Sequence, residues 1–185
     1  MGVAIRPESS ELNSAVVTDE TELTFVGFIA FLDPPKESAA EALKLLAEAG
    51  IKVKIITGDN ERVTQYVCKM LGMSNIKTIT GDQIAKLTEE AFVAQIESID
   101  AFCRITPLQK GTIIRLLRTK GNTVGFLGDG INDAAAMHVA DVGISVNTAT
   151  DVAKEAAEII LLELAAIKIY FCVLITARRP SKTPR

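Results

Sequence analysis

The chain has 185 residues, a length that suits one compact domain with an appendage. Its 20 Lys and Arg residues and 23 Asp and Glu residues give a net charge of −3 and a pI near 5.3, so no nucleic-acid partner is expected. With 48% hydrophobic and 23% charged residues, the composition is globular and excludes a disordered or fibrous chain. Three widely spaced cysteines argue against a disulfide framework or a zinc site.

Short apolar runs rich in β-forming residues alternate with helical segments between residues 24 and 162, which predicts an α/β fold with a parallel sheet covered by helices on both faces. In chain order, the expected elements are strand 23–32, helix 36–49, strand 51–56, helix 60–71, a turn at Thr80-Gly81-Asp82, helix 87–96, strand 101–104, helix 107–120, strand 122–127, helix 132–140, strand 142–146, helix 149–157 and strand 158–162. Such sheets bind ligands beyond the carboxyl ends of their strands.

Signals for export or membrane insertion are weak. Residues 1–12 include a polar stretch where a secretory signal needs an apolar one. The longest apolar run, 159–177, is interrupted by the charged residues Glu163 and Lys168, which are costly inside a bilayer. This run is therefore only a borderline candidate for a membrane span. The favoured interpretation is a buried strand that continues into an amphipathic tail.

The first stretch whose residues could bind a ligand is Thr57-Gly58-Asp59-Asn60, which follows a predicted strand and precedes a helix. A hydroxyl, an unhindered glycine N–H and a helix N-terminus together suit a phosphate oxygen. Asp59 or Asn60 could instead simply cap the next helix, as in ordinary turns. The sequence leaves both interpretations open.

The second stretch, residues 128–133, reads Gly-Asp-Gly-Ile-Asn-Asp and also follows an apolar strand. The glycines allow a sharp turn, so that Asp129 and Asp133 can approach a hard cation such as Mg²⁺, which takes oxygen ligands. A turn with a helix cap would explain one of these aspartates but not both together with the flanking glycines. A cation site is therefore favoured.

The third stretch, residues 104–110, leads from a strand end into a helix that begins with proline and presents Lys110 in its first turns. A lysine supplies a compact positive charge for a phosphate, although a single lysine is more often a solvated surface residue. All three stretches fall at carboxyl ends of strands in one predicted sheet, so a single crevice could gather them.

In their order and spacing, these stretches resemble the motifs of the haloacid-dehalogenase-like superfamily as they occur in P-type ATPases. Residues 31–37, 125–133 and 141–146 are most similar to the magnesium-transporting branch. The resemblance implies a Rossmann-like phosphorylation domain over residues 25–163, in incomplete form. Residues 1–24 would be a remnant of the nucleotide-binding domain or a linker, and residues 164–185 would be a divergent tail, apolar and then basic.

The resemblance also implies roles for the residues of the three stretches. Thr57 and Gly58 would hold the transferred phosphoryl group, which Lys110 would neutralise. Asn132 would bond to the same group. These four residues would form the catalytic set.

By the same resemblance, Asp129 would be a direct Mg²⁺ ligand, and Asp133 would support the metal site and orient the catalytic lysine. Asp59 and the hinge residues Asp33 and Lys36 would lie near bound ATP. The expected cofactors are therefore Mg²⁺ and ATP.

One part of the family pattern is missing. The attacking aspartate of an Asp-Lys-Thr-Gly-Thr segment has no counterpart at any aspartate of the chain, and without it no aspartyl-phosphate can form. In the family, the strand of this nucleophile lies in the middle of the sheet. Its loss is expected to expose the sheet centre and to favour self-association through free strand edges.

The sequence thus predicts part of the cytoplasmic catalytic headpiece of an ATP-driven cation pump, most similar to magnesium pumps and not competent alone. The alternatives are a Mg²⁺-dependent phosphatase of the same superfamily and a non-enzymatic regulatory fragment. Besides ATP and Mg²⁺, the expected partners are the missing parts of the pump. The expected location is the cytoplasmic face of a membrane in the parent protein, or the cytoplasm if the fragment is made alone.

Overall fold

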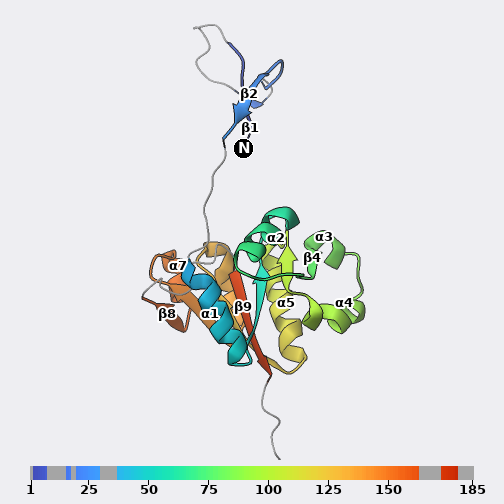
Figure 1. Ribbon diagram of the computed structural model, residues 1–185, viewed down its shortest axis with the longest axis vertical. Coiled ribbons are helices and arrows are strands. Elements are labelled where there is room, and N and C mark those ends of the chain that lie inside the picture. Colours follow the sequence, from blue (N-terminus) through green and yellow to red (C-terminus); the bar gives the residue numbers. More distant parts are fainter. Residues whose placement is uncertain (1, 8–15, 18–19, 30–36, 163–171, 179–185) are drawn as a thin grey trace, which may run out of the picture. The chain divides into compact units, whose positions relative to one another are not determined.

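The computed structural model describes residues 2–7, 16–17, 20–29, 37–162 and 172–178 (Figure 1). The chain divides into two compact units, Met1–Pro34 and Pro35–Arg185. The division falls between two prolines of the predicted hinge, whereas the sequence placed a boundary after residue 24.

The first unit contains a two-stranded antiparallel sheet of β1 (Gly2–Ile5) and β2 (Thr24–Phe28). Strand β2 lies within the predicted strand 23–32, but its placement in the parallel sheet is wrong. It pairs instead with β1, an apolar run that the sequence analysis did not identify as a strand. The rings of Phe25 and Phe28 meet edge to face with centroids 5.0 Å apart, which adds a contact within β2.

The second unit is built around a seven-stranded sheet of order β4-β5-β3-β9-β6-β7-β8. Six of these strands run parallel to one another and β9 runs the opposite way. This arrangement confirms the predicted α/β fold. The strands are β3 (Lys52–Ile56), β4 (Thr78–Thr80), β5 (Ala101–Cys103), β6 (Asn122–Leu127), β7 (Val142–Val146), β8 (Ile159–Leu161) and β9 (Cys172–Arg178).

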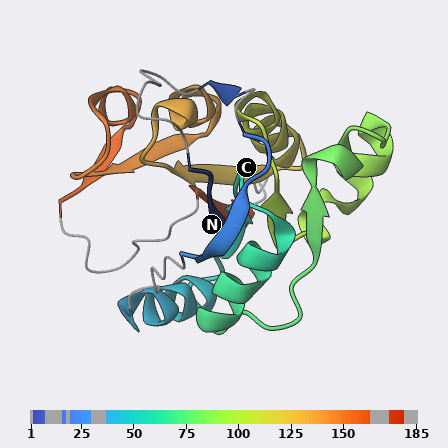
Figure 2. The same ribbon diagram turned by 90° about the horizontal axis from the view of Figure 1, so that it is seen from above.

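Helices cover both faces of this sheet (Figure 2). Helices α1 and α2 lie on one face, while α5, α6 and α7 lie on the other. The predicted turn at Thr80-Gly81-Asp82 is instead the start of α3, because the Thr80 side chain forms a capping box with Gln83. The helices are α1 (Glu37–Glu48), α2 (Glu61–Met70), α3 (Gly81–Ile84), α4 (Glu89–Gln95), α5 (Pro107–Thr119), α6 (Ala134–Val139) and α7 (Asp151–Glu155).

The core of the second unit lies between the sheet and these helices. Phe102 on β5 and Phe126 on β6 are fully buried, as are Ile114 and Leu117 on α5. Burial of each such side chain contributes about 1.5–3 kcal/mol relative to an exposed position. This core holds the strands in register and so fixes the positions of the loops that follow them.

Strand β9 occupies the centre of the sheet, where the sequence predicted a gap. It pairs with β3 on one side, from Lys52↔Thr176 to Ile56↔Cys172, and with β6 on the other. Leu174 of β9 is fully buried and Thr176 is 4% exposed. The expectation of an exposed sheet centre is therefore wrong, because a segment of the divergent tail satisfies the hydrogen bonds of both neighbouring strands.

The predicted strand at residues 158–162 is confirmed as β8. Of the rest of the long apolar run, residues 172–177 belong to β9 and residues 163–171 lie outside the described residues. In the described part of the chain, no helix has the length and apolar character needed to cross a membrane.

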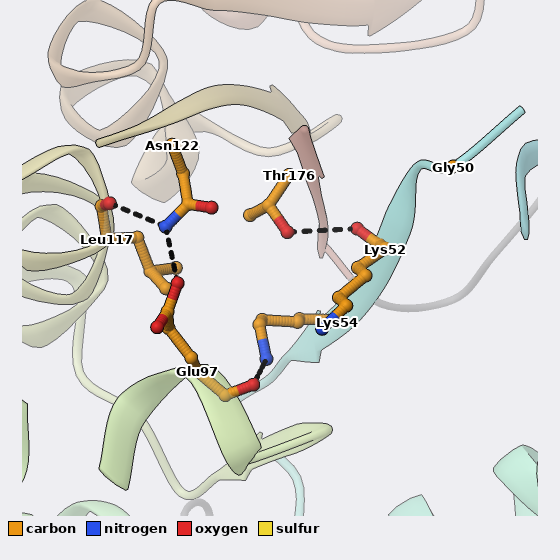
Figure 3. A pocket seen from close by; sticks show the side chains of 7 residues that line it. All are labelled: Gly50, Lys52, Lys54, Glu97, Leu117, Asn122 and Thr176. Carbon is orange, nitrogen blue, oxygen red and sulfur yellow. Dashed lines mark hydrogen bonds between the residues drawn. The ribbon is translucent and has the colours of Figure 1, made fainter. Parts of the chain in front are cut away.

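A buried lysine lies in the middle of β3, and its ammonium group reaches the segment that precedes β5. Lys54 of β3 is 3% exposed, and its Nζ donates a hydrogen bond to the carbonyl oxygen of Glu97 at 2.9 Å (Figure 3). The same Nζ also donates to the carbonyl oxygen of Ile99. Burial lowers the pKa of the Lys54 amine below its ordinary value of 10.5, and the nearby Asp100 charge opposes this only in part.

This lowered pKa makes stability depend on pH in the alkaline range. The folded chain releases the Lys54 proton at a lower pH than the unfolded chain, so Lys54 causes stability to rise as the pH increases from the lowered pKa toward 10.5. Lys54→Met is expected to remove this rise, measured as the change in urea midpoint between neutral and alkaline pH. Lys44→Met, at an exposed position of α1, should leave it unchanged.

Candidate active site

Three loops meet the same edge of the sheet. Strands β3, β5 and β6 are mutually parallel, since β3 pairs in parallel with β5 and both β3 and β6 are antiparallel to β9. Thr57, Arg104 and Gly128 come directly after the last residues of these strands. The structure therefore places the three predicted stretches at one carboxyl edge, as the sequence analysis expected.

The loop after β3 is rigidly held by its own hydrogen bonds and by the loop after β5. The Thr57 Oγ1 accepts a hydrogen bond from the Asp59 backbone N–H at 3.0 Å and donates one to Asp59 Oδ2 at 3.2 Å. The backbone N–H groups of Arg104 and Ile105 donate to the carbonyl oxygens of Asp59 and Thr57, both at 2.9 Å. Thr57 is buried, while Gly58 and Asp59 are exposed at the edge.

Asn60 has the role of a helix cap. Its Oδ1 accepts a hydrogen bond from the Val63 backbone N–H at 3.0 Å, at the start of α2. The capping interpretation is thus correct for Asn60. Gly58 and Asp59 remain exposed at the strand end, where they could meet a ligand.

The centre of the site is a buried ion pair. Lys110 of α5 is 8% exposed and Asp133 is 4% exposed, and the Lys110 Nζ lies 2.7 Å from Asp133 Oδ1. The other carboxylate oxygen, Oδ2, accepts a hydrogen bond from the Gly130 backbone N–H at 3.2 Å. Lys110 is therefore not a solvated surface lysine, because its ammonium group lies buried beside the Asp133 carboxylate.

The loop at residues 128–133 is also held by two residues, Ser145 and Thr150, that were not among the predicted site residues. The buried Ser145 hydroxyl donates to the Gly128 carbonyl oxygen at 3.1 Å. The backbone N–H of Thr150 donates to the Asp129 carbonyl oxygen at 3.1 Å, while its hydroxyl caps α7. The capping role of Thr150 could be inferred from its place before a helix, but its contact with Asp129 depends on the tertiary fold.

Glycine is required at position 128 because the loop packs closely on Asp133. A Cβ atom on Gly128 would lie 2.7 Å from the Asp133 Cβ, whereas a Cβ on Gly58 would meet nothing closer than 4.0 Å. Gly128→Ala is therefore expected to destabilise the chain by about 1–3 kcal/mol, as overpacking does. Gly58→Ala is the matched control, and its urea midpoint should stay close to that of the unsubstituted chain.

The donor set partly suits a magnesium ion. Asp129 is exposed, and Asp133 already accepts hydrogen bonds at both carboxylate oxygens. A carboxylate has further lone pairs, so Asp129 can be a direct oxygen ligand while Asp133 supports it. Among the described residues there is no group of three acidic, histidine or cysteine side chains that could hold a metal. Two carboxylates leave room for waters and phosphate oxygens in the shell of Mg²⁺.

Of the three remaining predicted site residues, the structure describes only Asn132. Asn132 lies in the short 3₁₀ turn between Gly130 and α6 and is exposed at the same edge. Asp33 and Lys36 lie outside the described residues, so their predicted role near ATP remains a prediction.

Residues 4–141 match the haloacid dehalogenase-like hydrolases. The chain belongs to this family. Among curated proteins, the haloacid dehalogenase-like chain is 50% identical over 147 residues to a magnesium-transporting ATPase, P-type 1, of Salmonella typhimurium. It is 49% identical over 145 residues to the protein of the same name in Escherichia coli. These alignments cover 80% and 78% of this chain but only 16% of either relative.

More distant relatives extend the similarity to other P-type ATPases. A calcium-transporting ATPase 1 of Lactococcus lactis is 33% identical over 177 residues, which cover 95% of this chain and 20% of that protein. Among solved structures, the catalytic domain of the CPx-ATPase CopB-B has a TM-score of 0.50 and 26% identity, covering 75% of this chain and 42% of that one. The resemblance to P-type ATPases is confirmed, and the chain matches their catalytic headpiece region.

Proposed function

We propose that this chain is the phosphate- and magnesium-holding part of the headpiece of an ATP-driven cation pump, with magnesium as the transported ion. The parent pump would lie in a membrane with this part on its cytoplasmic side. The transported ion rests on the similarity to magnesium-transporting ATPases. The chain spans 16% of the length of those relatives, and its function would depend on the other parts of the pump.

The observation that carries this proposal is the buried Lys110–Asp133 pair beside a glycine-rich loop. Burying the charged amine of a lysine costs free energy. Here the Asp133 carboxylate, 2.7 Å from the Lys110 Nζ, offsets that cost and keeps the ammonium group at the edge of the site. Phosphoryl transfer depends on positioning and on neutralising negative charge, which is the task that a fixed ammonium group performs.

The other residues of the edge have complementary roles in the proposal. Thr57 and the Gly58 N–H would bind oxygens of the phosphoryl group from the β3 side, and Asn132 would bind it from the β6 side. Asp129 would be the direct Mg²⁺ ligand, and Asp133 would support it. When bound, Mg²⁺ supplies positive charge to the phosphate oxygens. Asp59, Asp33 and Lys36 would lie near ATP.

Phosphate binding tests this function without requiring turnover. Inorganic phosphate is titrated into the full chain with and without Mg²⁺ and observed by ³¹P NMR. We expect millimolar binding, which Lys110→Met weakens about tenfold, because a charge-assisted hydrogen bond is lost. Asp129→Asn should remove the effect of Mg²⁺ on phosphate affinity. Lys44→Met, on the exposed side of α1, is the control and should bind as the unsubstituted chain does.

Equal phosphate affinity in all of these variants would refute the proposed function. The phosphatase alternative is tested by incubating the chain with Mg²⁺ and ATP or a phosphate ester. No phosphate release is expected, because the chain lacks the attacking aspartate segment. Release that disappears in Asp129→Asn would favour the phosphatase instead.

A further inference from the structure

Asp129 combines a side chain that is open to ligands with a backbone that is held in place. Its carboxylate is exposed, and within the described residues it makes no hydrogen bond or ion pair. Both carboxylate oxygens of Asp133, by contrast, already accept hydrogen bonds from the Lys110 Nζ and the Gly130 N–H. The direction in which the Asp129 carboxylate projects therefore depends on how its own backbone is held.

One segment, residues 145–150, anchors the peptide groups on both sides of the Asp129 Cα. On the side that precedes the Cα, the Gly128 carbonyl oxygen accepts a hydrogen bond from the Ser145 hydroxyl at 3.1 Å. On the side that follows, the Asp129 carbonyl oxygen accepts one from the Thr150 N–H at 3.1 Å and a longer one from the Thr150 hydroxyl at 3.4 Å. Because each peptide group is planar, holding both of them fixes the backbone dihedrals of Asp129 and with them the direction of its Cα–Cβ bond.

The Ser145 side chain has a specific partner in this loop. Ser145 is fully buried, and it lies in β7, whose sequence Val-Gly-Ile-Ser-Val is otherwise apolar. A buried hydroxyl costs free energy unless it is hydrogen-bonded, and the Gly128 carbonyl that it meets belongs to a buried residue as well. The bond between them thus satisfies two buried polar groups and joins β7 to the site loop.

Thr150 contributes to the same loop through its backbone. It is the N-cap of α7, with φ of −63° and ψ of 152°, and its hydroxyl accepts a hydrogen bond from the Ala153 N–H at 3.4 Å. In this position its own N–H lies outside the helix and bonds to Asp129 instead. Proline fixes φ near −65°, so Thr150→Pro removes the N–H without requiring a new φ at this position.

We propose that Ser145 and Thr150 are positioning residues that hold the Asp129 carboxylate in the direction needed to bind a divalent cation. This role rests on the proposed function, because the cation is the Mg²⁺ that Asp129 would bind. Partners that orient a metal ligand affect metal affinity without touching the metal, and their loss commonly weakens binding by a factor of 10 to 100.

Mn²⁺ binding to the full chain tests this role, with Mn²⁺ alone as the probe because it favours the same oxygen ligands as Mg²⁺. Electron paramagnetic resonance measures the free Mn²⁺. Ser145→Ala should weaken binding about tenfold. Thr150→Pro should weaken it by a similar factor relative to Thr150→Ala, which loses the hydroxyl and the cap but keeps the N–H. Thr176→Val is the control, because it removes another buried hydroxyl that bonds to a carbonyl, that of Lys52, and it should bind as the unsubstituted chain does.

A second measurement follows the loop itself in the absence of metal. Amide ¹⁵N relaxation should give Asp129 an order parameter of about 0.85 in the unsubstituted chain and in Thr176→Val, as for a rigid backbone. The value should fall to about 0.6 or below in Ser145→Ala and in Thr150→Pro. A residue that only contributes to stability would lower the urea midpoint and leave this order parameter unchanged.

An Asp129 order parameter that stays the same in Ser145→Ala and Thr150→Pro would overturn the positioning role. An equal loss of Mn²⁺ affinity in Thr176→Val would also overturn it, because the loss would then follow stability in general. If the unsubstituted chain binds Mn²⁺ and every variant binds it equally well, the positioning role fails while the proposed magnesium site stands. If the unsubstituted chain binds no Mn²⁺, the proposed magnesium site fails and the role of Ser145 and Thr150 toward a cation fails with it.

Discussion

Replacing Lys110 with methionine is expected to lower the free energy of unfolding by about 3–5 kcal/mol. The substitution removes the ammonium group 2.7 Å from Asp133 and leaves a carboxylate that is 4% exposed without that partner. An uncompensated buried charge costs far more than the pair itself contributes to stability. The measurement is urea unfolding at neutral pH followed by circular dichroism.

A matched substitution at a surface pair separates this effect from the general loss of a lysine. Lys44 and Glu48 are 3.9 Å apart on α1, with side chains 77% and 60% exposed. Lys44→Met should therefore change stability by less than about 1 kcal/mol. Combining Lys110→Met with Asp133→Asn should recover part of the loss, because the charge that remained buried is then absent. A Lys110→Met variant as stable as Lys44→Met would show that the pair is not buried as described.

Removal of β9 is expected to abolish cooperative unfolding and to produce large species in gel filtration. A chain that ends after residue 171 lacks the strand that pairs with both β3 and β6, so two central strands would be left with unpaired backbone groups. Such edges recruit strands of other chains. The self-association expected from the sequence would then appear in this variant.

The control is a chain that ends after Arg178, which keeps all of β9. It should elute as the full chain does and unfold cooperatively. If the chain without β9 behaves in the same way as this control, β9 does not complete the sheet.

The sequence predicted the site loops well because their structure depends on local chemistry. Pro107 begins α5, and Thr106 caps it by accepting a hydrogen bond from the Gln109 N–H at 3.3 Å. The glycines at positions 128 and 130 similarly mark a tight turn after an apolar strand. In each case, the residues that determine the conformation are neighbours in the chain.

Other features could not be predicted because they depend on contacts between distant residues. The burial of Lys110 was ambiguous until the fold placed Asp133 beside it, 23 residues further along the chain. Ser145 could not be recognised as a partner of the Gly128 carbonyl, since nothing in its immediate sequence indicates that contact. Strand β1 was missed because a short apolar run becomes a strand only when a partner edge is available.

The sequence by itself determined the α/β class, the three loops at the carboxyl edge and the absence of an attacking aspartate segment, because each depends on residue types at short spacing. Only the tertiary structure decided what fills the centre of the sheet. Thr176 bonds to the Lys52 carbonyl across 124 residues of chain, and such a pairing leaves no local signal. The physical reason is that backbone hydrogen bonds join β9 to β3 and β6, and these bonds form between residues that are far apart in the chain.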